Sequence, residues 1–123
     1  MTEHRDPAIR VTAMPADANA YGDIFGGWLM SLMDSAAGLI AARRSKGRAV
    51  TVAMDGVQFH EPVSVGDEVS VYGEILKIGR SSLTIAVEAW RRHRHEEAEV
   101  KVTEATFTFV AVDANGRPRP VEA

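Results

Sequence analysis

The sequence predicts an α+β fold in which an antiparallel sheet wraps around one long helix. Three observations carry this prediction. Residues 26–45 form an apolar segment whose bulky side chains recur at helical spacing. The later part of the chain alternates between apolar and polar residues in runs joined by short polar turns, which indicates consecutive antiparallel strands. A chain of 123 residues offers nothing else to cover the apolar face of that sheet, so we expect one domain over residues 1–123.

The expected elements follow in chain order. A short edge strand covers residues 8–13, and a loop rich in Pro, Asp, Asn and Gly covers residues 15–22. The helix extends over about 26–45, with cations in its last turn and Gly47 as the expected C-cap. Strands are expected at 49–59, 69–78, 83–90 and 100–112, and residues 113–120 form a polar turn.

Composition excludes several classes of protein. The absence of Cys rules out disulfides, thiolate catalysis and Cys-ligated metal sites, and a net charge of -3 argues against general nucleic-acid binding. The first ten residues lack the apolar core of a signal peptide, so we expect a cytoplasmic protein. Residues 24–42 are long enough to span a membrane, but Asp34 at their centre would cost about 2.5–3.5 kcal/mol there. A helix buried inside a small protein, with no membrane contact, is the better interpretation.

Asp34 is the first candidate for chemistry, because it lies within the apolar helix. Its neighbours on the same helical face are small or slim, so another backbone or a narrow ligand could approach there: Gly27, Met30, Ser31, Gly38 and Ala41. The opposite face carries the bulky residues expected to meet the sheet: Phe25, Leu29, Leu32, Met33 and Ile40. A carboxylate in such surroundings can act as a general base or nucleophile. A hydrogen bond to a neighbouring chain is an equally good interpretation.

The start of the helix is the second candidate. Gly26 and Gly27 leave backbone N–H groups open at the positive end of the helix dipole, which suits an oxyanion, although the same glycines could simply permit a tight loop. Gly26 and Asp34 lie roughly 12 Å apart along the axis at ~1.5 Å per residue. One small reacting group cannot touch both. Either one feature alone is catalytic, or each site joins the helix start of one chain to Asp34 of another, which predicts a symmetric dimer.

Weaker candidates surround these two. Asp23 is typical of a helix-capping residue, and Asn19 suits either a ligand hydrogen bond or an ordinary turn. Arg91 opens a cationic run that could meet a phosphorylated ligand or form a solvated strand end. His93 and His95 have no third ligand nearby, so we expect no metal site. A hairpin could bind phosphate through its amides and its cation, or merely turn the chain: Gly79, Arg80, Ser81 and Ser82.

Four stretches of the sequence resemble the hotdog-fold acyl-CoA thioesterases, and within them the YciA-type branch related to the cytosolic acyl-CoA hydrolases. The stretches, which cover about residues 9–119, are AMPADANAYGDIFGGWLMSLMD, VTVAMDGVQFHEPVSVGDEV, KIGRSSLTIAVEAW and TEATFTFVAVD. The resemblance implies a sheet curled round a central helix, dimers that pair into one larger sheet, and assembly into hexamers as trimers of dimers. It further implies hydrolysis of acyl-CoA to free acid and CoA, without a cofactor.

The resemblance also implies roles for individual residues. Asp34 matches the catalytic carboxylate, the amide of Gly26 or Gly27 matches the group that polarises the thioester carbonyl, and Asp23 matches a polar active-site position. The hairpin at 79–82 and the basic residues after Trp90 lie where relatives approach the CoA nucleotide.

Two places depart from the pattern of this branch. Tyr21 stands where the branch usually has Asn, and His60 and Glu61 stand where it usually has an apolar residue followed by Arg or Lys. Two other functions remain open on the same fold. One is a non-catalytic acyl-CoA-binding or sensing module. The other is a hydratase or dehydratase, which usually pairs a His with a carboxylate near the helix, and residues 5–59 contain no His.

Overall fold

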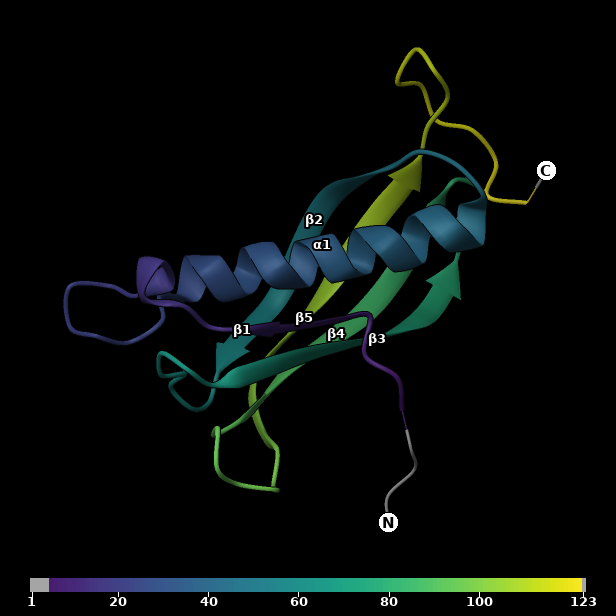
Figure 1. Ribbon diagram of the computed structural model, residues 1–123. Coiled ribbons are helices and arrows are strands. Elements are labelled where there is room, and N and C mark those ends of the chain that lie inside the picture. The colour runs from purple at the N-terminus through teal and green to yellow at the C-terminus, as the bar shows by residue number, and fades with distance from the viewer. Residues whose placement is uncertain (1–4, 123) are drawn as a thin grey trace.

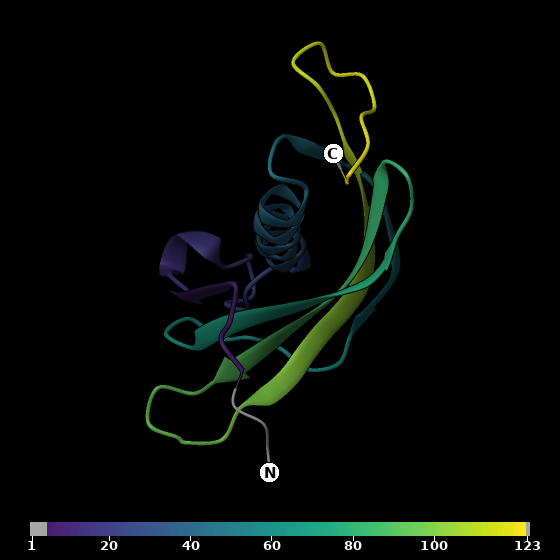
Figure 2. The same ribbon diagram turned by 90° about the vertical axis from the view of Figure 1, so that its right-hand side faces the viewer.

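A five-stranded antiparallel sheet curls around one long helix in the computed structural model, which describes residues 5–122 (Figures 1 and 2). The elements are β1 (Ile9–Thr12), η1 (Pro15–Asp17), α1 (Gly26–Ser45), β2 (Ala49–Phe59), β3 (Glu68–Ile78), β4 (Ser82–Arg92) and β5 (Val100–Ala111). The strand order is β1-β3-β4-β5-β2, and every pairing is antiparallel. The predicted α+β architecture is confirmed, and each predicted element is present.

The core lies between α1 and the concave face of the sheet. Alternate residues of β3, β4 and β5 point into it and meet Leu29 and Met33 of the helix. Each large apolar side chain buried there contributes about 1.5–3 kcal/mol. The fully buried strand residues include Val69, Val71, Leu83, Ile85, Val87, Val102 and Phe107. No helix of the described residues is long and apolar enough to cross a membrane.

The faces of α1 differ in part from the sequence prediction. Ala41, expected beside Asp34 on the open face, is fully buried. Gly38 lies under Phe109 of β5, because a Cβ at Gly38 would be 3.7 Å from Cε2 of that ring. Phe25, expected to face the sheet, is an exposed N-cap residue. The small residues Gly38 and Ala41 thus face the sheet and not an open side of the helix. Their size lets α1 approach β5 closely.

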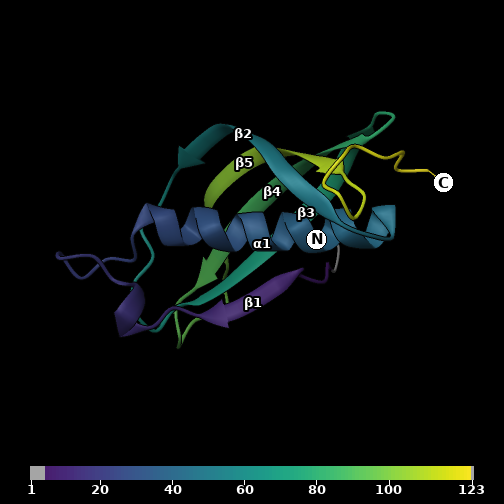
Figure 3. The ribbon, with the colours of Figure 1, turned by 90° about the horizontal axis from the view of Figure 1, so that it is seen from above.

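β2 forms one edge of the sheet, on the opposite side of α1 from β1 (Figure 3). It pairs with β5 on one side, and no described strand pairs with it on the other. Two register shifts interrupt its pairing, and Val52 and Phe59 remain 56% and 50% exposed. A long edge of unpaired backbone groups is usually covered in native proteins. This edge is therefore a candidate for pairing with a further strand.

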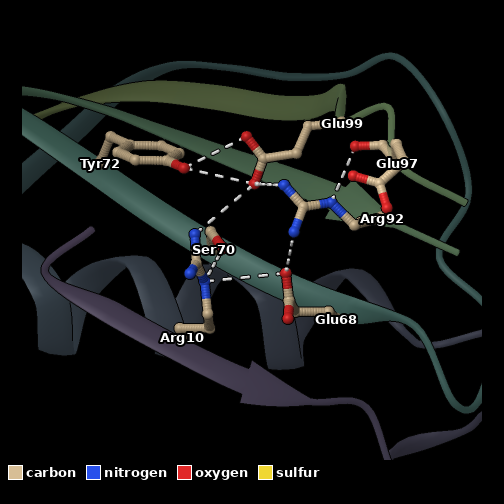
Figure 4. Close-up of polar contacts among 7 residues, drawn as sticks. All are labelled: Arg10, Glu68, Ser70, Tyr72, Arg92, Glu97 and Glu99. Atoms are coloured by element: carbon tan, nitrogen blue, oxygen red, sulfur yellow. Dashed lines mark hydrogen bonds and ion pairs between the residues drawn. The ribbon is translucent and has the colours of Figure 1, made fainter. Parts of the chain in front are cut away.

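The outer face of β3 carries a polar network that holds β1 and the connection between β4 and β5 (Figure 4). Arg10 of β1 donates to the hydroxyl of the buried Ser70, with a distance of 2.7 Å. Arg92 donates to Glu68 at 3.1 Å, and its other nitrogen lies 3.7 Å from Glu99. Arg92 is therefore paired with one carboxylate of β3 and one of the connection between β4 and β5.

Arg119 holds the C-terminal end of α1, which ends at Ser45 as predicted. The left-handed C-cap is Lys46 (φ 55°), so the prediction of Gly47 as the cap is wrong. The Arg119 guanidinium donates to the carbonyls of Ser45 (2.9 Å), Arg48 (3.1 Å) and Val112 (2.8 Å). A Cβ at Gly47 would lie 2.6 Å from this guanidinium, so Gly47 is needed for space.

We expect Arg119→Ala to lower the free energy of unfolding by about 1–3 kcal/mol, since it leaves several carbonyl oxygens without a donor. Urea denaturation at a fixed protein concentration would measure the loss. Arg117→Ala is the matched control, because that side chain is exposed and has no hydrogen bond in the described part of the chain. Equal losses in the two variants would contradict the role of Arg119.

Candidate active site

Asp34 is half-buried in the middle of α1 and faces the edge strand β2. The hydroxyl of Thr51 donates to its Oδ1 at 2.5 Å. A short hydrogen bond from a hydroxyl holds a carboxylate in one rotamer. Sequence reasoning missed Thr51, which looks like an ordinary strand residue. Its signal was indirect, because a hydroxyl on the strand that follows the helix in the chain is a suitable partner for a helical carboxylate.

The first turn of α1 presents unoccupied amide groups. Its N-cap is Phe25, which supplies no side-chain acceptor. Within the described residues, the N–H groups of Gly26 and Gly27 have no hydrogen-bond acceptor. The interpretation of Asp23 as a helix cap is therefore wrong, since Asp23 lies two residues before the N-cap. The two amides thus lack an acceptor among the described residues, while the binding of a ligand oxygen there stays a prediction.

A cavity of about 430 Å³ opens beside this helix start. Its apolar lining comes from Ile24, Leu29, Phe59 and Val63, and the Gly26 backbone also faces it. Phe59, the last residue of β2, lies over Gly26: a Cβ at Gly26 would be 3.1 Å from Cζ of the ring. Normal carbon contacts are about 3.5–4.0 Å, so only a residue without Cβ fits beneath this ring undisturbed.

The loop that enters the helix is held by its own polar groups. The side-chain oxygen of Asn19 accepts hydrogen bonds from the N–H groups of Tyr21 (2.8 Å) and Asp23 (3.1 Å). The N–H of Ile24 donates to the carbonyl of Val63 at 2.9 Å. The side-chain NH₂ of Asn19 has no acceptor among the described residues and is exposed. Asn19 thus shapes the loop while keeping one donor available.

The predicted phosphate-binding hairpin lies elsewhere. Residues 79–82 connect β3 to β4 at the end of the sheet where α1 terminates, away from the helix start (Figure 1). The N–H of Gly79 donates to the carbonyl of Ser82 at 2.9 Å, so that amide closes the turn. Ser81 accepts from the N–H of Ala111 (2.8 Å). Arg80 is exposed, and no partner for its guanidinium exists in residues 5–122.

Arg91 lies close to the cavity but is turned inward. Its side chain is 12% exposed, its Nε donates to the carbonyl of Pro62 at 2.9 Å, and its Nη2 lies 3.8 Å from Glu61. Arg91 therefore braces the segment that lines the cavity. In the described part of the chain, no group of three or more His, Asp or Glu residues is arranged to hold a metal ion.

His60 and Glu61, the two residues that depart from the branch pattern, both line the cavity. His60 Nε2 lies 2.7 Å from a carboxylate oxygen of Glu104 on β5. This hydrogen bond is the main reason that the pKa of Glu104 lies below its ordinary value. Desolvation opposes the shift, and Lys101 reinforces it.

Known proteins match most of the chain. A family model described as the thioesterase superfamily matches residues 21–98. An uncharacterized acyl-CoA thioester hydrolase of Zymomonas mobilis is 57% identical over 113 residues, which are 92% of this chain and 76% of that protein. The acyl-CoA thioester hydrolase YciA of Escherichia coli is 47% identical over 122 residues, 95% of this chain and 92% of that protein.

Solved structures match the fold. The hexameric thioesterase y2039 from Yersinia pestis aligns with a TM-score of 0.93 at 46% identity, over 99% of each chain. A hexameric hotdog-fold thioesterase of Campylobacter jejuni aligns with a TM-score of 0.88 at 36% identity, over 94% of this chain and 90% of that one. The hotdog fold predicted from the resemblance is confirmed.

An acyl-CoA hydrolase of Staphylococcus aureus gives a more distant match. Its Asn-to-Ala mutant, solved with coenzyme A, aligns with a TM-score of 0.86 at 26% identity, over 91% of this chain and 67% of that one. An Asp-to-Ala mutant of the same enzyme has also been solved.

The contact between His60 and Glu104 makes a pH-dependent prediction. We expect the Glu104 carboxyl to titrate below its ordinary value of 4.5, and His60→Ala to raise its pKa toward that value. Because the folded-state pKa is depressed, the contact stabilises the fold above the ordinary pKa and stops doing so as the pH falls through the folded-state pKa. Side-chain carboxyl ¹³C NMR would measure the titration.

His93→Ala is the matched control, since the His93 ring bonds Asp67 (2.8 Å) and not Glu104. A Glu104 titration that is unchanged after removal of His60 would contradict the assignment.

Proposed function

Because this chain belongs to the thioesterase superfamily, we propose that it hydrolyses acyl-CoA thioesters to a free acid and CoA, at a site that two copies of the chain share. The observation that carries the shared site is the position of β2. One edge strand touches both candidate features: Thr51 bonds Asp34, and Phe59 lies over Gly26.

A two-fold axis through the middle of β2 would bring Asp34 of one chain close to Gly26 of another, which the helix keeps apart within a single chain. If the β2 edges of two copies pair antiparallel about that middle, Thr51 of one copy lies beside the Phe59 end of the other strand. Asp34 of one chain then approaches the helix start of its partner. The same pairing covers the open edge of β2 and its exposed Val52.

The proposed chemistry uses groups of the chain and water. The amide of Gly26 or Gly27 donates to the thioester carbonyl oxygen, which gains negative charge as the carbonyl carbon is attacked. In one route, Asp34 accepts a proton from water as the oxygen of that water bonds the carbon; the C–S bond then breaks, and the proton passes to the departing thiolate of CoA. In the other route, the Asp34 carboxylate attacks the carbon itself, and the C–S bond breaks to release the thiolate of CoA. Water then hydrolyses the anhydride to the free acid and the Asp34 carboxylate, and a proton from that water passes to the thiolate.

The spacing of two residues supports this assignment. Asn19 and Asp34 are separated by the same number of residues as the asparagine and the aspartate replaced in the Staphylococcus aureus hydrolase mutants. We infer that the free NH₂ of Asn19 donates to the substrate, while Asp23 keeps a polar position beside it. The hairpin Gly79–Ser82, through Arg80, is the proposed contact for the CoA phosphates, and Arg91 acts from behind the cavity wall.

The proposal extends to assembly and location. The homodimer is the minimal unit, and three such dimers form a hexamer; the relatives from Yersinia pestis and Campylobacter jejuni are hexameric. The chain acts as a single domain in the cytoplasm. It needs no metal or cofactor, and CoA takes part only as a portion of the substrate and as a product. It binds neither nucleic acid nor membrane.

A thiol-release assay with acyl-CoAs of several chain lengths tests the activity. The proposal expects release of free CoA. Tight binding without turnover would instead indicate an acyl-CoA sensor, and a change at an alkene with CoA retained would indicate a hydratase; either result would overturn the proposal.

Two substitutions test whether two chains share each site. Gly26→Pro removes the first amide donor at a position where Pro is well tolerated, whereas Gly26→Ala adds the same Cβ and keeps the donor. We expect kcat of the Pro variant to fall about 10²–10³-fold below that of the Ala variant. Asp34→Asn should be inactive while the oligomer persists. If kcat of Gly26→Pro equals that of Gly26→Ala, the amide of Gly26 is not the donor to the thioester oxygen, and Gly27 is the remaining candidate.

Mixing the two defective chains then separates a shared site from one within a single chain. In a mixed dimer with a shared site, one site carries both defects and the other carries neither, so random mixing should recover about a quarter of wild-type activity. Sites confined to one chain would each keep one defect, and the mixture would stay as inactive as its parents. The measurement is CoA release after co-expression or subunit exchange.

The hydrogen bond from Thr51 should orient Asp34. Thr51→Val keeps the shape and removes the donor, so we expect kcat to fall about 10–100-fold, as for loss of a hydrogen bond to a charged group. Thr51→Ser retains the hydroxyl and should keep most of the activity. If Val and Ser variants were equally active, Thr51 would have no positioning role.

A further inference from the structure

The cavity beside the helix start has a use that the reaction itself does not require. Asp34 and the amides account for bond breaking, yet about 430 Å³ of space adjoins Gly26. Most of its lining side chains are apolar, namely Ile24, Leu29, Phe59, Pro62 and Val63, and His60 and Glu61 complete it. A volume in this range suits a small-molecule ligand, and apolar walls suit a hydrocarbon.

Of the two arms of an acyl-CoA, the acyl chain fits these walls better. The two polar side chains of the lining already have partners, since His60 bonds Glu104 at 2.7 Å and Glu61 lies 3.8 Å from Arg91. The pantetheine arm carries two amides, and each would lose its hydrogen bonds to water without finding enough partners here. An acyl chain carries no polar group beyond the carbonyl. Gly26 itself lines the cavity, so a thioester whose carbonyl oxygen meets the Gly26 amide has this space beside it for its acyl chain.

Among the side chains that line this cavity, we expect Phe59 to tolerate substitution best. The residues on either side of it are fixed: the carbonyl of Gln58 accepts from Thr103 at 2.6 Å, and the N–H of His60 donates to Val102 at 2.7 Å. The ring itself is 50% exposed and lies against the Gly26 backbone. Its backbone is therefore anchored, while its side chain occupies space that a substrate could use.

We propose that the ring of Phe59 limits the room beside Gly26 and so sets which acyl chains the site accepts. This inference rests on the proposed thioesterase activity. A smaller residue at position 59 lengthens the space available to the acyl chain, and a larger one shortens it. Phe59 is thus a specificity-determining residue that takes no part in bond making.

The test compares kcat/KM for acetyl-, butyryl-, octanoyl- and palmitoyl-CoA between the wild-type chain and Phe59 variants. We expect Phe59→Ala to raise the ratio of kcat/KM for octanoyl-CoA to kcat/KM for acetyl-CoA at least about 10-fold. One methylene group in an apolar pocket changes discrimination between substrates by about this factor. Phe59→Trp should lower the same ratio. Val52→Ala is the matched control, because Val52 is similarly exposed on the same strand (56%) and does not line the cavity.

Each outcome has a separate meaning. If the wild-type chain releases no CoA from any substrate, the proposed function fails. If it is active but Phe59→Ala and Phe59→Trp keep the wild-type ratio, this inference alone fails. If Val52→Ala shifts the ratio equally, edge pairing rather than Phe59 sets the preference, and the inference also fails. Should Phe59→Ala lose the oligomer by size-exclusion chromatography, Phe59→Leu and Phe59→Trp provide the comparison.

Discussion

The rigidity of α1 is the constraint on which the proposed site depends. A helix packed along the sheet cannot shorten, so the open amides at its start stay roughly 12 Å from Asp34 at ~1.5 Å per residue. The buried Leu29 and Met33, between these two points, hold this part of the helix against the core. A site that needs both features must therefore draw them from two molecules. Dimer formation is, in this proposal, a condition of the chemistry.

β2 connects this constraint to the sheet. It lies at the edge, where its unpaired side is open to a partner, and its two halves touch the two features that must meet. Arg91 supports the segment that follows β2 by binding the carbonyl of Pro62. The framework around the cavity is thus fixed by contacts to the backbone. The proposed reaction uses only the side chains of Asp34 and Thr51 and the amides at the start of α1.

Much of this arrangement could be predicted from the sequence. The helix and the strands follow from local periodicity, and Asp34 and Gly26 stand out because a charge within an apolar helix and a glycine pair at a helix start are both unusual. The strand order could not be predicted from local pattern, because β2 pairs with β5 and not with β3, the next strand in the chain. Pairing of that kind depends on contacts between distant residues.

Thr51 and Phe59 were missed for the same reason. Each is a typical strand residue, and each takes its meaning from a helix residue that the fold brings beside it. The glycine at 47 was misread as the helix cap: the left-handed residue is Lys46, and Gly47 makes room for Arg119, more than seventy residues away. Local pattern identifies elements and unusual residues, whereas roles that depend on a neighbour distant in the chain require the fold.

An edge strand on a two-fold axis also couples the evolution of the two sites. In the proposed dimer, the residue at the axis would face its own copy, and the residues next to it would lie close to theirs. An inserted or deleted residue there would shift the register at both sites at once, and a new charge would meet an identical charge. The middle of β2 should therefore change rarely and in small steps, while the Phe59 end can vary, because there each strand faces a different residue of its partner.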